Sequence, residues 1–414
     1  MTVKELATNA KAAAPYLAVC STQQKNDLLL CIAEKLVQHQ ELILQANAQD
    51  LKNAKDAGIK ATMCDRLMLN EQRIRALASS VREIVDLADP IGTVLYETER
   101  PNGLKIQKIS VPMGLIGIIY EARPNVTVDA AALCIKAGSA VILRGGKEAI
   151  HSNQALVKIM RSALAQCNMP EDCICLIEDT SRDSSYALMR MHGIVDLLIP
   201  RGGAGLIRSV VENATVPVIE TGVGNCHIYV DEAADVDMAA QIIFNAKCSR
   251  PSVCNACETV LVHEKIAEQA LPKIAQALDQ NQVELRGCEK TCSILGDRAC
   301  RAQETDYQTE FLDYILAVKV VASIDDAIQH IRTYSTGHSE SIITQDQTQA
   351  DYFVARIDSA AVYVNASTRF TDGGEFGFGA EIGISTQKLH ARGPMGLQEM
   401  TSYKYVICGN GQVR

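Results

Sequence analysis

Cys254 is the first candidate for chemistry, in the segment RPSVCNA. A helical pattern ends near Lys247 and a loop with Pro251 follows. The apolar run ETVLVH then begins at Glu258. A thiol in such a loop can be partly exposed, and the neighbouring Arg250 favours its thiolate form. The segment indicates a nucleophilic cysteine, although a structural cysteine fits the same local pattern.

Two other chemistries could use this cysteine. Cys254-x-x-Cys257 could form half of a zinc site, but no second pair at the usual spacing accompanies it, so we expect no metal. A cysteine hydrolase would need a histidine, and His227, His330 and His338 are the candidates. Ordinary hydrogen bonding is the alternative role for the last two, and the sequence leaves the choice open.

Two glycine turns are candidates for binding an anion. Arg144-Gly145-Gly146-Lys147 and Arg201-Gly202-Gly203 each follow an apolar run and precede a helical pattern. Backbone N–H groups at such turns can face an anion, helped by the helix dipole, and the two basic residues of the first turn suit a phosphorylated ribose. Neither turn has the order G-x-G-x-x-G, so glycines that only serve tight turns remain the other interpretation.

Glu220 is a further candidate, because it ends the apolar run VPVIE just before Gly222. We expect a strand there. Its carboxylate could act as a general base or could cap the next turn.

The elements that must position these residues follow from hydrophobic periodicity. Residues 1–88 are helical in pattern, and 93–110 contain Asn-Gly between alternating residues, which predicts a hairpin. From residue 111 onward apolar runs alternate with helical stretches, which predicts parallel sheets in an α/β fold with doubly wound topology. The expected strands are LIGIIY, AVILR, ICLIE, VDLLIP, VPVIE, HIYVD, ETVLVH, ILAVKVV, ESIIT and AAVYVN.

Composition excludes several classes of protein. Among 414 residues, 40 Lys and Arg stand against 49 Asp and Glu, so the net charge is −9, which argues against a general nucleic-acid binder. No apolar run is long enough to cross a membrane, and the N-terminal sequence lacks the pattern of a signal peptide. We therefore expect a cytoplasmic protein whose fifteen cysteines are reduced and mostly buried.

In order along the chain, these segments resemble the aldehyde dehydrogenase superfamily. The resemblance covers nearly the whole chain, and the first hundred residues contribute least. Within the superfamily it is most similar to the reductases of acyl phosphates. Four stretches carry it: VPMGLIGIIYEARPNVTVDAAALCIKAGSAVILRGGKEA, NAKCSRPSVCNACETVLVH, AIQHIRTYSTGHSESIIT and VYVNASTRFTDGGEFGFGAEIGIST.

The resemblance implies a role for each matching residue. It makes Cys254 the nucleophile and Asn125 a donor to the oxyanion, and it places Glu220 at the position of the superfamily's general base, where an acyl-phosphate reductase has no obvious use for one. Arg144 stands where the superfamily has lysine, and Gly145-Gly146 replace Pro-Ser. The implied cofactor-binding residues are Arg144, Gly145, Gly146, Lys147, Gly202, Gly203 and Glu310, and the candidate substrate-binding residues are Arg123, Arg250 and Arg369.

The resemblance also implies an activity and a domain plan. The expected reaction is reduction of L-glutamyl 5-phosphate by NADPH to L-glutamate 5-semialdehyde and phosphate, through a cysteine thioester, in proline biosynthesis. The alternative is another NAD(P)-dependent aldehyde dehydrogenase of the superfamily, and the rivals from other classes are a cysteine hydrolase and a silent nucleotide-binding protein. The expected parts are an NADPH-binding domain (1–92, 111–225 and 360–395), a catalytic domain (226–359) and an oligomerisation arm (93–110 and 396–414) that makes a dimer or a dimer of dimers.

Overall fold

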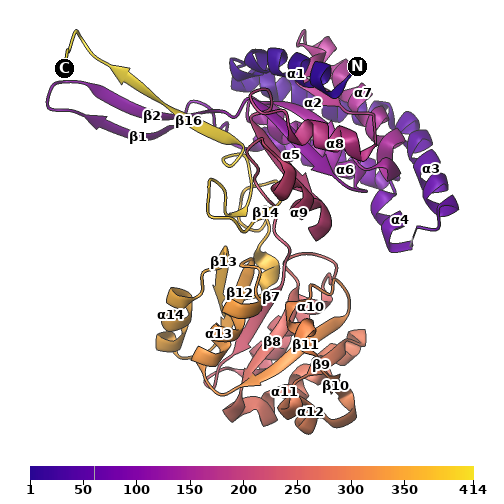
Figure 1. Cartoon of the computed structure of the whole chain (residues 1–414), viewed down its shortest axis with the longest axis vertical. Helices are drawn as coiled ribbons and strands as arrows, with labels where there is room; N and C mark the ends of the chain where they lie inside the picture. The colour runs from indigo at the N-terminus through magenta and orange to yellow at the C-terminus, as the bar shows by residue number, and fades with distance from the viewer. Residues whose placement is uncertain (60) are drawn as a thin grey trace. The chain divides into compact units, whose positions relative to one another are not determined.

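The computed structural model describes residues 1–59 and 61–414, which divide into two compact units. The first unit contains residues 1–221, 377–383 and 395–414, and the second contains 222–376 and 384–394 (Figure 1). Each unit has its own parallel sheet with helices packed on it, which confirms the predicted α/β class.

The first unit opens with helices, as the periodicity predicted. Thr2 and Ser21 begin the first two helices as capping boxes, in which side chain and backbone satisfy each other's donors. Leu28, Ile32 and Leu36 lie on one stripe of the second helix and are fully buried, so burial of this face holds the helix in place. The helices are α1 (Val3–Ala18), α2 (Thr22–Gln38), α3 (Gln40–Asp56), α4 (Ala61–Leu67) and α5 (Glu71–Asp86).

The sheet of the first unit has the order β5-β4-β3-β6, with all pairs parallel. Its first strand in the chain lies inside the sheet and is buried along its whole length, as expected for a strand covered on both faces. The chain winds first to one side of this strand and then to the other. The elements are β3 (Leu115–Tyr120), α6 (Pro124–Lys136), β4 (Ala140–Arg144), α7 (Ile150–Gln166), β5 (Ile174–Leu176), α8 (Arg182–Met189), β6 (Leu197–Arg201) and α9 (Ala204–Asn213).

The prediction of a strand at VPVIE is wrong. Only one isolated parallel bridge forms, between Leu198 and Val218. Pro217 offers its carbonyl to the Leu198 N–H at 2.8 Å, but it has no N–H of its own with which to continue a ladder. Glu220 therefore lies in irregular backbone rather than at the end of a strand.

The sheet of the second unit has seven parallel strands in the order β10-β9-β11-β8-β7-β12-β13. Two of them, β9 and β10, were not expected from the sequence, because runs of three and four residues give too short an alternation to recognise. The strands are β7 (Cys226–Val230), β8 (Cys257–His263), β9 (Glu284–Gly287), β10 (Ala299–Arg301), β11 (Ile315–Val321), β12 (Ser339–Ile343) and β13 (Ala361–Val364).

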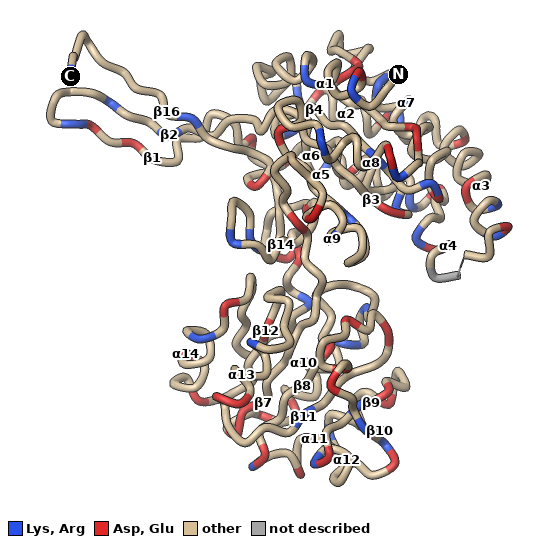
Figure 2. The backbone as a smooth tube through the Cα atoms, in the orientation of Figure 1, with Lys and Arg blue, Asp and Glu red and all other residues tan. Residues whose placement is uncertain are grey.

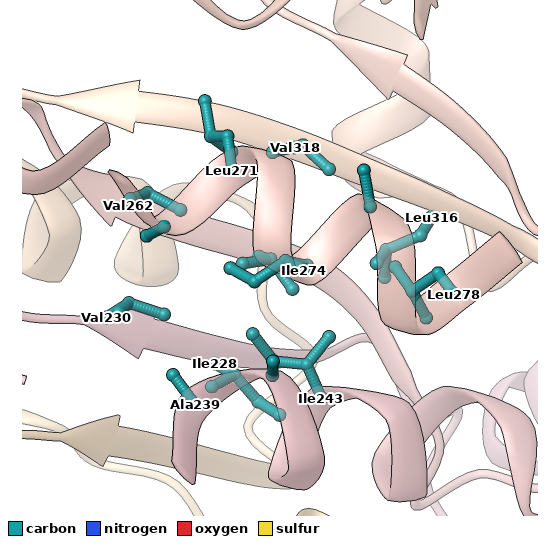
Figure 3. Packing of buried hydrophobic residues seen from close by; sticks show 14 of the residues in the cluster. Ile228, Val230, Ala239, Ile243, Val262, Leu271, Ile274, Leu278, Leu316 and Val318 are labelled. Atoms are coloured by element: carbon teal, nitrogen blue, oxygen red, sulfur yellow. The ribbon is translucent and has the colours of Figure 1, made fainter. Parts of the chain in front are cut away.

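Helices cover both faces of this sheet. On one face, Ile243 of α10 and Ile274 of α11 pack against Ile228 and Val262 in a cluster of buried aliphatic side chains (Figure 3). The helices are α10 (Val236–Cys248), α11 (Glu264–Leu278) and α12 (Glu289–Leu295) on this face, and α13 (Ile324–Tyr334) and α14 (Gln347–Arg356) on the other.

The expected domain boundary needs one correction. Residues 360–395 were assigned to the cofactor domain, but β13 pairs with β12 in parallel and is the edge strand of the second sheet. Two short strands, β14 (Ile384–Ser385) and β15 (Gly393–Pro394), also group with the second unit, and only 377–383 of this stretch group with the first. Backbone pairing between distant segments, which no local pattern reveals, decided this boundary.

The predicted hairpin forms one side of a three-stranded antiparallel sheet made of β1 (Val94–Glu99), β2 (Lys105–Pro112) and β16 (Thr401–Cys408). The central strand pairs along its full length with the C-terminal one. Glu99 lies opposite Lys105, and the tube in Figure 2 is coloured for acidic and basic positions along these neighbouring strands. The arm expected from 93–110 and 396–414 is therefore a sheet of three strands.

Candidate active site

In the first unit, the candidate residues gather at the carboxyl edge of the sheet. The chain leaves β3 and β6 in opposite directions, and this switch point is where doubly wound sheets bind ligands. Glu121 follows the first strand, and Gly202-Gly203 follow the second. The Gly203 N–H donates to the Glu121 carboxylate at 2.9 Å, and a Cβ on Gly202 would lie 2.7 Å from the same carboxylate. A side chain at 202 would therefore have to displace the Glu121 carboxylate.

The turn after β4 is organised by Arg144. Its guanidinium donates to the carbonyls of Thr180 (2.8 Å) and Ser181 (2.7 Å), while its Nε is buried without a hydrogen-bond partner among the described residues. Burial lowers the pKa of this guanidinium, and Asp179 and Glu148 oppose the shift. Gly145 is packed so tightly that a Cβ would meet a neighbouring amide at 2.2 Å. Lys147, by contrast, is exposed.

Asn125 lies in the first turn of α6, where Pro124 occupies the first helical position and loses no hydrogen bond. The Asn125 amide donates to the Asp129 carboxylate at 3.1 Å, one helical turn further on. Burial raises the pKa of Asp129 to about 6, against the opposing effects of Asn125 and Arg201. An ionised Asp129 therefore fixes one amide proton and leaves the second one for a ligand.

In the second unit, Cys254 lies in the loop between α10 and β8 and is partly exposed. Its carbonyl accepts a hydrogen bond from the Cys226 thiol, 3.2 Å away. A Cβ on Gly224 would come within 1.5 Å of the same carbonyl oxygen, so only glycine can occupy position 224. The loop is held at the amino edge of the sheet by contacts to its backbone.

Arg369 is tied to the residue that follows the cysteine. Its guanidinium donates to the Asn255 side chain and to Ser249 Oγ at 3.1 Å. The Asn255 amide donates in return to backbone carbonyls near Arg369. Burial and the like charge of Arg250 lower the pKa of Arg369, whereas the negative charges of Asp372, Glu375 and Cys254 raise it. Since this interaction is mutual, Arg369 also stabilises the Cys254 thiolate.

Glu310 contacts the glycine segment that packs against the Cys254 loop. Its carboxylate accepts a hydrogen bond from the Gly224 N–H at 2.8 Å. Burial raises the pKa of Glu310, and the Gly224 N–H and the Lys247 ammonium partly oppose that shift. The structure therefore brings Glu310 onto the glycine segment that packs against Cys254.

A buried ion pair supports this region. Lys247 and Glu258 are both fully buried, with 2.6 Å between ammonium and carboxylate. Burial raises the pKa of Glu258 to about 7, and the Lys247 charge works against that rise. Glu258 also accepts from the backbone N–H of Leu312. The pair joins the end of α10 to the start of β8, on either side of the cysteine loop.

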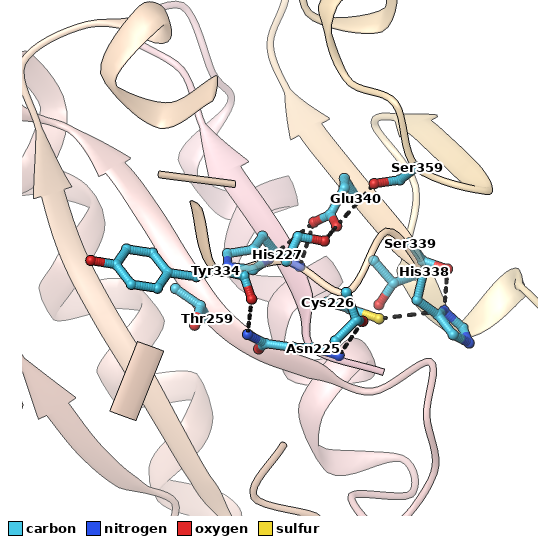
Figure 4. A network of polar contacts seen from close by, with 12 residues as sticks. Asn225, Cys226, His227, Thr259, Tyr334, His338, Ser339, Glu340 and Ser359 are labelled. Carbon is cyan, nitrogen blue, oxygen red and sulfur yellow. Dashed lines mark hydrogen bonds and ion pairs between the residues drawn. The ribbon is translucent and has the colours of Figure 1, made fainter. Parts of the chain in front are cut away.

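The candidate histidines have other partners. His338 Nδ1 lies 3.6 Å from the Cys226 sulfur and 2.8 Å from Ser339 Oγ, and burial lowers the pKa of His338 to about 4 (Figure 4). His227 lies 3.2 Å from the buried Glu340 carboxylate. His330 contacts Lys319. His338 and His330 are thus neutral at physiological pH, and both are buried.

The cysteines form no disulfide anywhere in the chain that the structure describes. Seven of the fifteen are buried, so the expectation that most would be buried is wrong; six are intermediate and two are exposed. Within residues 1–59 and 61–414, no helix is both long and apolar enough to cross a bilayer.

Four residues with a role at these sites were missed by sequence reasoning: Glu121, Asp129, Gly224 and Asn255. For Gly224 the available signal was the pair of glycines in Gly222-Val223-Gly224, just after an apolar run. Asn255 could have been recognised from its position directly after Cys254. For Glu121 and Asp129 no local signal exists, because their partners are defined by the strand order and by the course of one helix.

The comparison with known proteins agrees with the geometry. Residues 1–292 and 298–406 match the model of the aldehyde dehydrogenase family, so the chain belongs to that family. This confirms the resemblance found in the sequence, and members of the family use NAD or NADP. The cofactor-type edge of the first unit and the cysteine loop of the second fit this class of oxidoreductase.

Two relatives and one solved structure, all of the same enzyme, are similar to this chain over nearly its whole length. The chain is 61% identical over 412 residues to gamma-glutamyl phosphate reductase of Carboxydothermus hydrogenoformans, covering 100% of this chain and 99% of the relative. It is 58% identical over 405 residues to the enzyme of that name from Moorella thermoacetica, covering 98% and 97%. The crystal structure of gamma-glutamyl phosphate reductase from Thermotoga maritima superposes with a TM-score of 0.98 at 50% identity, covering all of both chains.

Proposed function

We propose that this chain reduces L-glutamyl 5-phosphate to L-glutamate 5-semialdehyde with NADPH and releases phosphate, in proline biosynthesis. The relatives that it matches over its whole length carry the name of this reductase. The observation that carries the chemistry is the partly exposed Cys254, whose backbone is fixed by Cys226 and Gly224 and whose thiolate is stabilised by Arg369.

Cys254 performs the covalent step. Its thiolate attacks the acyl carbon, the bond from that carbon to the phosphate oxygen breaks, and phosphate leaves with a thioester formed on the sulfur. Arg123, Arg250 and Arg369 are the cations that we assign to the substrate's carboxylate and phosphate. Hydride addition to the thioester carbon and cleavage of the carbon–sulfur bond then release the aldehyde and restore the thiolate.

Asn125 stabilises the oxyanion. One proton of its amide is held by Asp129, so the other is oriented for the oxygen on which negative charge develops. Glu220 has no assigned role, since water activation by a base would hydrolyse the thioester instead of reducing it.

Several residues are suited to hold a dinucleotide with a 2′-phosphate. The buried, unpartnered Arg144 Nε, the exposed Lys147 and the backbone of Gly145-Gly146 form one cationic turn. Gly202-Gly203 form the second contact, where the Glu121 carboxylate must leave the Gly203 N–H to a cofactor phosphate. Glu310 is assigned to the nicotinamide ribose. When bound, the reduced nicotinamide supplies the hydride.

The three-stranded arm is assigned to contact with another copy of the chain. Its side chains Tyr96, Tyr403, Tyr405 and Ile407 are each more than half exposed, and three strands with such exposed faces are not expected to be stable alone. We infer a homo-oligomer, a dimer or a dimer of dimers, that works in the cytoplasm, where the fifteen thiols stay reduced.

One assay tests the activity. Reduction of NADP⁺ is followed with L-glutamate 5-semialdehyde while phosphate is varied. Turnover that requires phosphate supports the proposal. Turnover independent of phosphate would favour an ordinary aldehyde dehydrogenase of the same family, and release of free glutamate from the acyl phosphate without nicotinamide would favour a hydrolase.

A further inference from the structure

A cavity of about 370 Å³ lies within the second unit, between the end of β11 and one flank of α13. Its walls include Lys319 and Val321 from the strand and Asp326, His330 and Thr333 from the helix. The helix residues recur every three or four positions, so they form one stripe along the helix. None of the residues assigned to the reaction lines this cavity, and its size is in the range of sites for small molecules.

The strand register explains which side chains face the cavity. Val318 and Val320 belong to the aliphatic cluster with α11, on one face of the sheet (Figure 3). Val321 packs with the side chains of α13 on the opposite face. Because neighbours in a strand alternate between faces, Lys319 shares the α13 face with Val321. A cationic side chain is therefore directed to the face on which α13 packs.

Lys319 has no counter-ion among the residues that the structure describes. Its ammonium lies 3.3 Å from His330 Nδ1 and 5.3 Å from the centroid of the Tyr307 ring, and no carboxylate of the described chain lies within ion-pair distance of it. Lys247, in the same unit, is paired with Glu258 at 2.6 Å. A half-buried ammonium without an anion leaves an unbalanced charge at the cavity wall.

His330 adds an unsatisfied donor. An ammonium can only donate, so Nδ1 of His330 must accept, which puts the ring proton on Nε2. Burial, with the charges of His227 and Lys319, lowers the pKa of His330 to about 2, so the ring stays neutral. The side chain is 4% exposed, and its Nε2 has no hydrogen-bond partner among the residues described. Buried donors of this kind are normally satisfied by water or by a ligand.

We propose that the cavity between β11 and α13 binds a small carboxylate monoanion, with its oxygen atoms on the Lys319 ammonium and its apolar part against Val321. One cation balances one negative charge, and the nearby Asp326 carboxylate disfavours a dianion such as phosphate. The Thr333 hydroxyl at the wall donates to the Gln329 carbonyl at 2.8 Å, so Lys319 is the donor that this wall offers to an anion. The site is separate from the proposed reaction and does not depend on it.

Butanoate is a suitable probe, with inorganic phosphate and butylamine as comparisons. Binding to the full-length protein is measured by calorimetry and located by the shifts of ¹³C-labelled valine methyl groups. We expect saturable binding of butanoate with a shift at Val321 and no shift at Val253 of the cysteine loop. Lys319→Met should weaken binding at least ~10-fold, since a charge-assisted hydrogen bond is lost.

Two variants control for folding and for charge in general. Lys319→Arg keeps the cation and should retain binding, and Lys273→Met, on α11 across the sheet and paired with Asp237, should not change it. Neither Lys319 variant should change phosphate-dependent turnover. Stronger binding of phosphate or butylamine than of butanoate, shifts at Val253 alone, or full binding by Lys319→Met would each overturn the proposal.

Discussion

The two sites differ in how their sheets are used. In the first unit, the candidate residues follow the carboxyl ends of β3, β4 and β6, where backbone N–H groups and glycines meet. In the second unit, they precede the amino ends of β7 and β8, where side chains of distant segments hold a cysteine loop. The first arrangement is a common property of doubly wound sheets, whereas the second depends on side-chain contacts between segments far apart in this chain. Binding is thus expected of one edge and covalent chemistry of the other.

The sharpest test of this division is Cys254→Ser. A hydroxyl is a far weaker nucleophile than a thiolate, so we expect kcat to fall by at least ~10³-fold. Binding of NADPH, measured by fluorescence titration, should be unchanged. The exposed Cys300→Ser is the matched control and should keep full activity. Loss of NADPH binding in Cys254→Ser would contradict the division between a cofactor-binding edge and an edge for covalent chemistry.

Asn125→Ala tests whether the first unit also takes part in the chemistry. Removal of one oxyanion donor is expected to lower kcat by ~10²-fold or more with little change in KM. The measurement is steady-state turnover of semialdehyde. An equal rise in KM with constant kcat would mean that Asn125 only binds substrate.

A pair of glycine variants compares the two edges directly. In Gly224→Ala the new methyl group meets a backbone carbonyl at 1.5 Å, so the cysteine loop must move, and we expect a ~10²-fold loss of kcat/KM. In Gly202→Ala it meets the Glu121 carboxylate, the end of a flexible side chain, at 2.7 Å, and the loss should be smaller. Equal losses of kcat/KM in Gly224→Ala and Gly202→Ala would contradict the proposed difference between the two sheet edges.

Lys147→Ala tests the proposed 2′-phosphate contact. We expect KM for NADPH to rise by roughly 10-fold while KM for NADH stays the same, because only the phosphorylated ribose loses a cation. Lys158→Ala, an exposed lysine further along the same segment of chain, is the control. A parallel rise for both cofactors would remove this residue from the phosphate site.

The smallest effect is expected at Asp129. Its folded-state pKa is raised to about 6, so its ionisation destabilises the fold as pH rises from the unfolded value through 6. Asp129→Asn should therefore raise Tm by about 2 °C at pH 8 and by less at pH 5, as followed by circular dichroism. A larger gain in Tm at pH 5 than at pH 8 would show that the pKa of Asp129 is not raised in the folded state.

Much of the fold was predictable from local patterns. The helices α1 to α5 lie within the predicted helical region 1–88, and nine of the ten expected strands occur where periodicity placed them. The failures have physical causes: Pro217 interrupts the expected strand VPVIE, and β9 and β10 are too short to show alternation. The assignment of 360–395 failed because strand pairing, not composition, places that segment.

The candidate site was predictable only in part. Cys254 was recognisable from its loop and from family resemblance, and the glycine turns from their position after apolar runs. Glu310 was known only through the resemblance, and its contact with the Gly224 N–H is a finding of the structure. Asp129 could not be recognised, because a carboxylate one turn after an amide is common on helices.

The sequence by itself determined the fold class and predicted the candidate cysteine and the cationic turn, since these depend on residue types and spacings within a few turns of chain. The tertiary structure alone decided which atoms hold them: the Cys226 thiol and Gly224 on the Cys254 carbonyl, and Glu121 at Gly203. Such contacts join residues up to 82 positions apart in these cases. Only the packed sheets bring them within a few ångströms, and hydrogen bonds act only at that range.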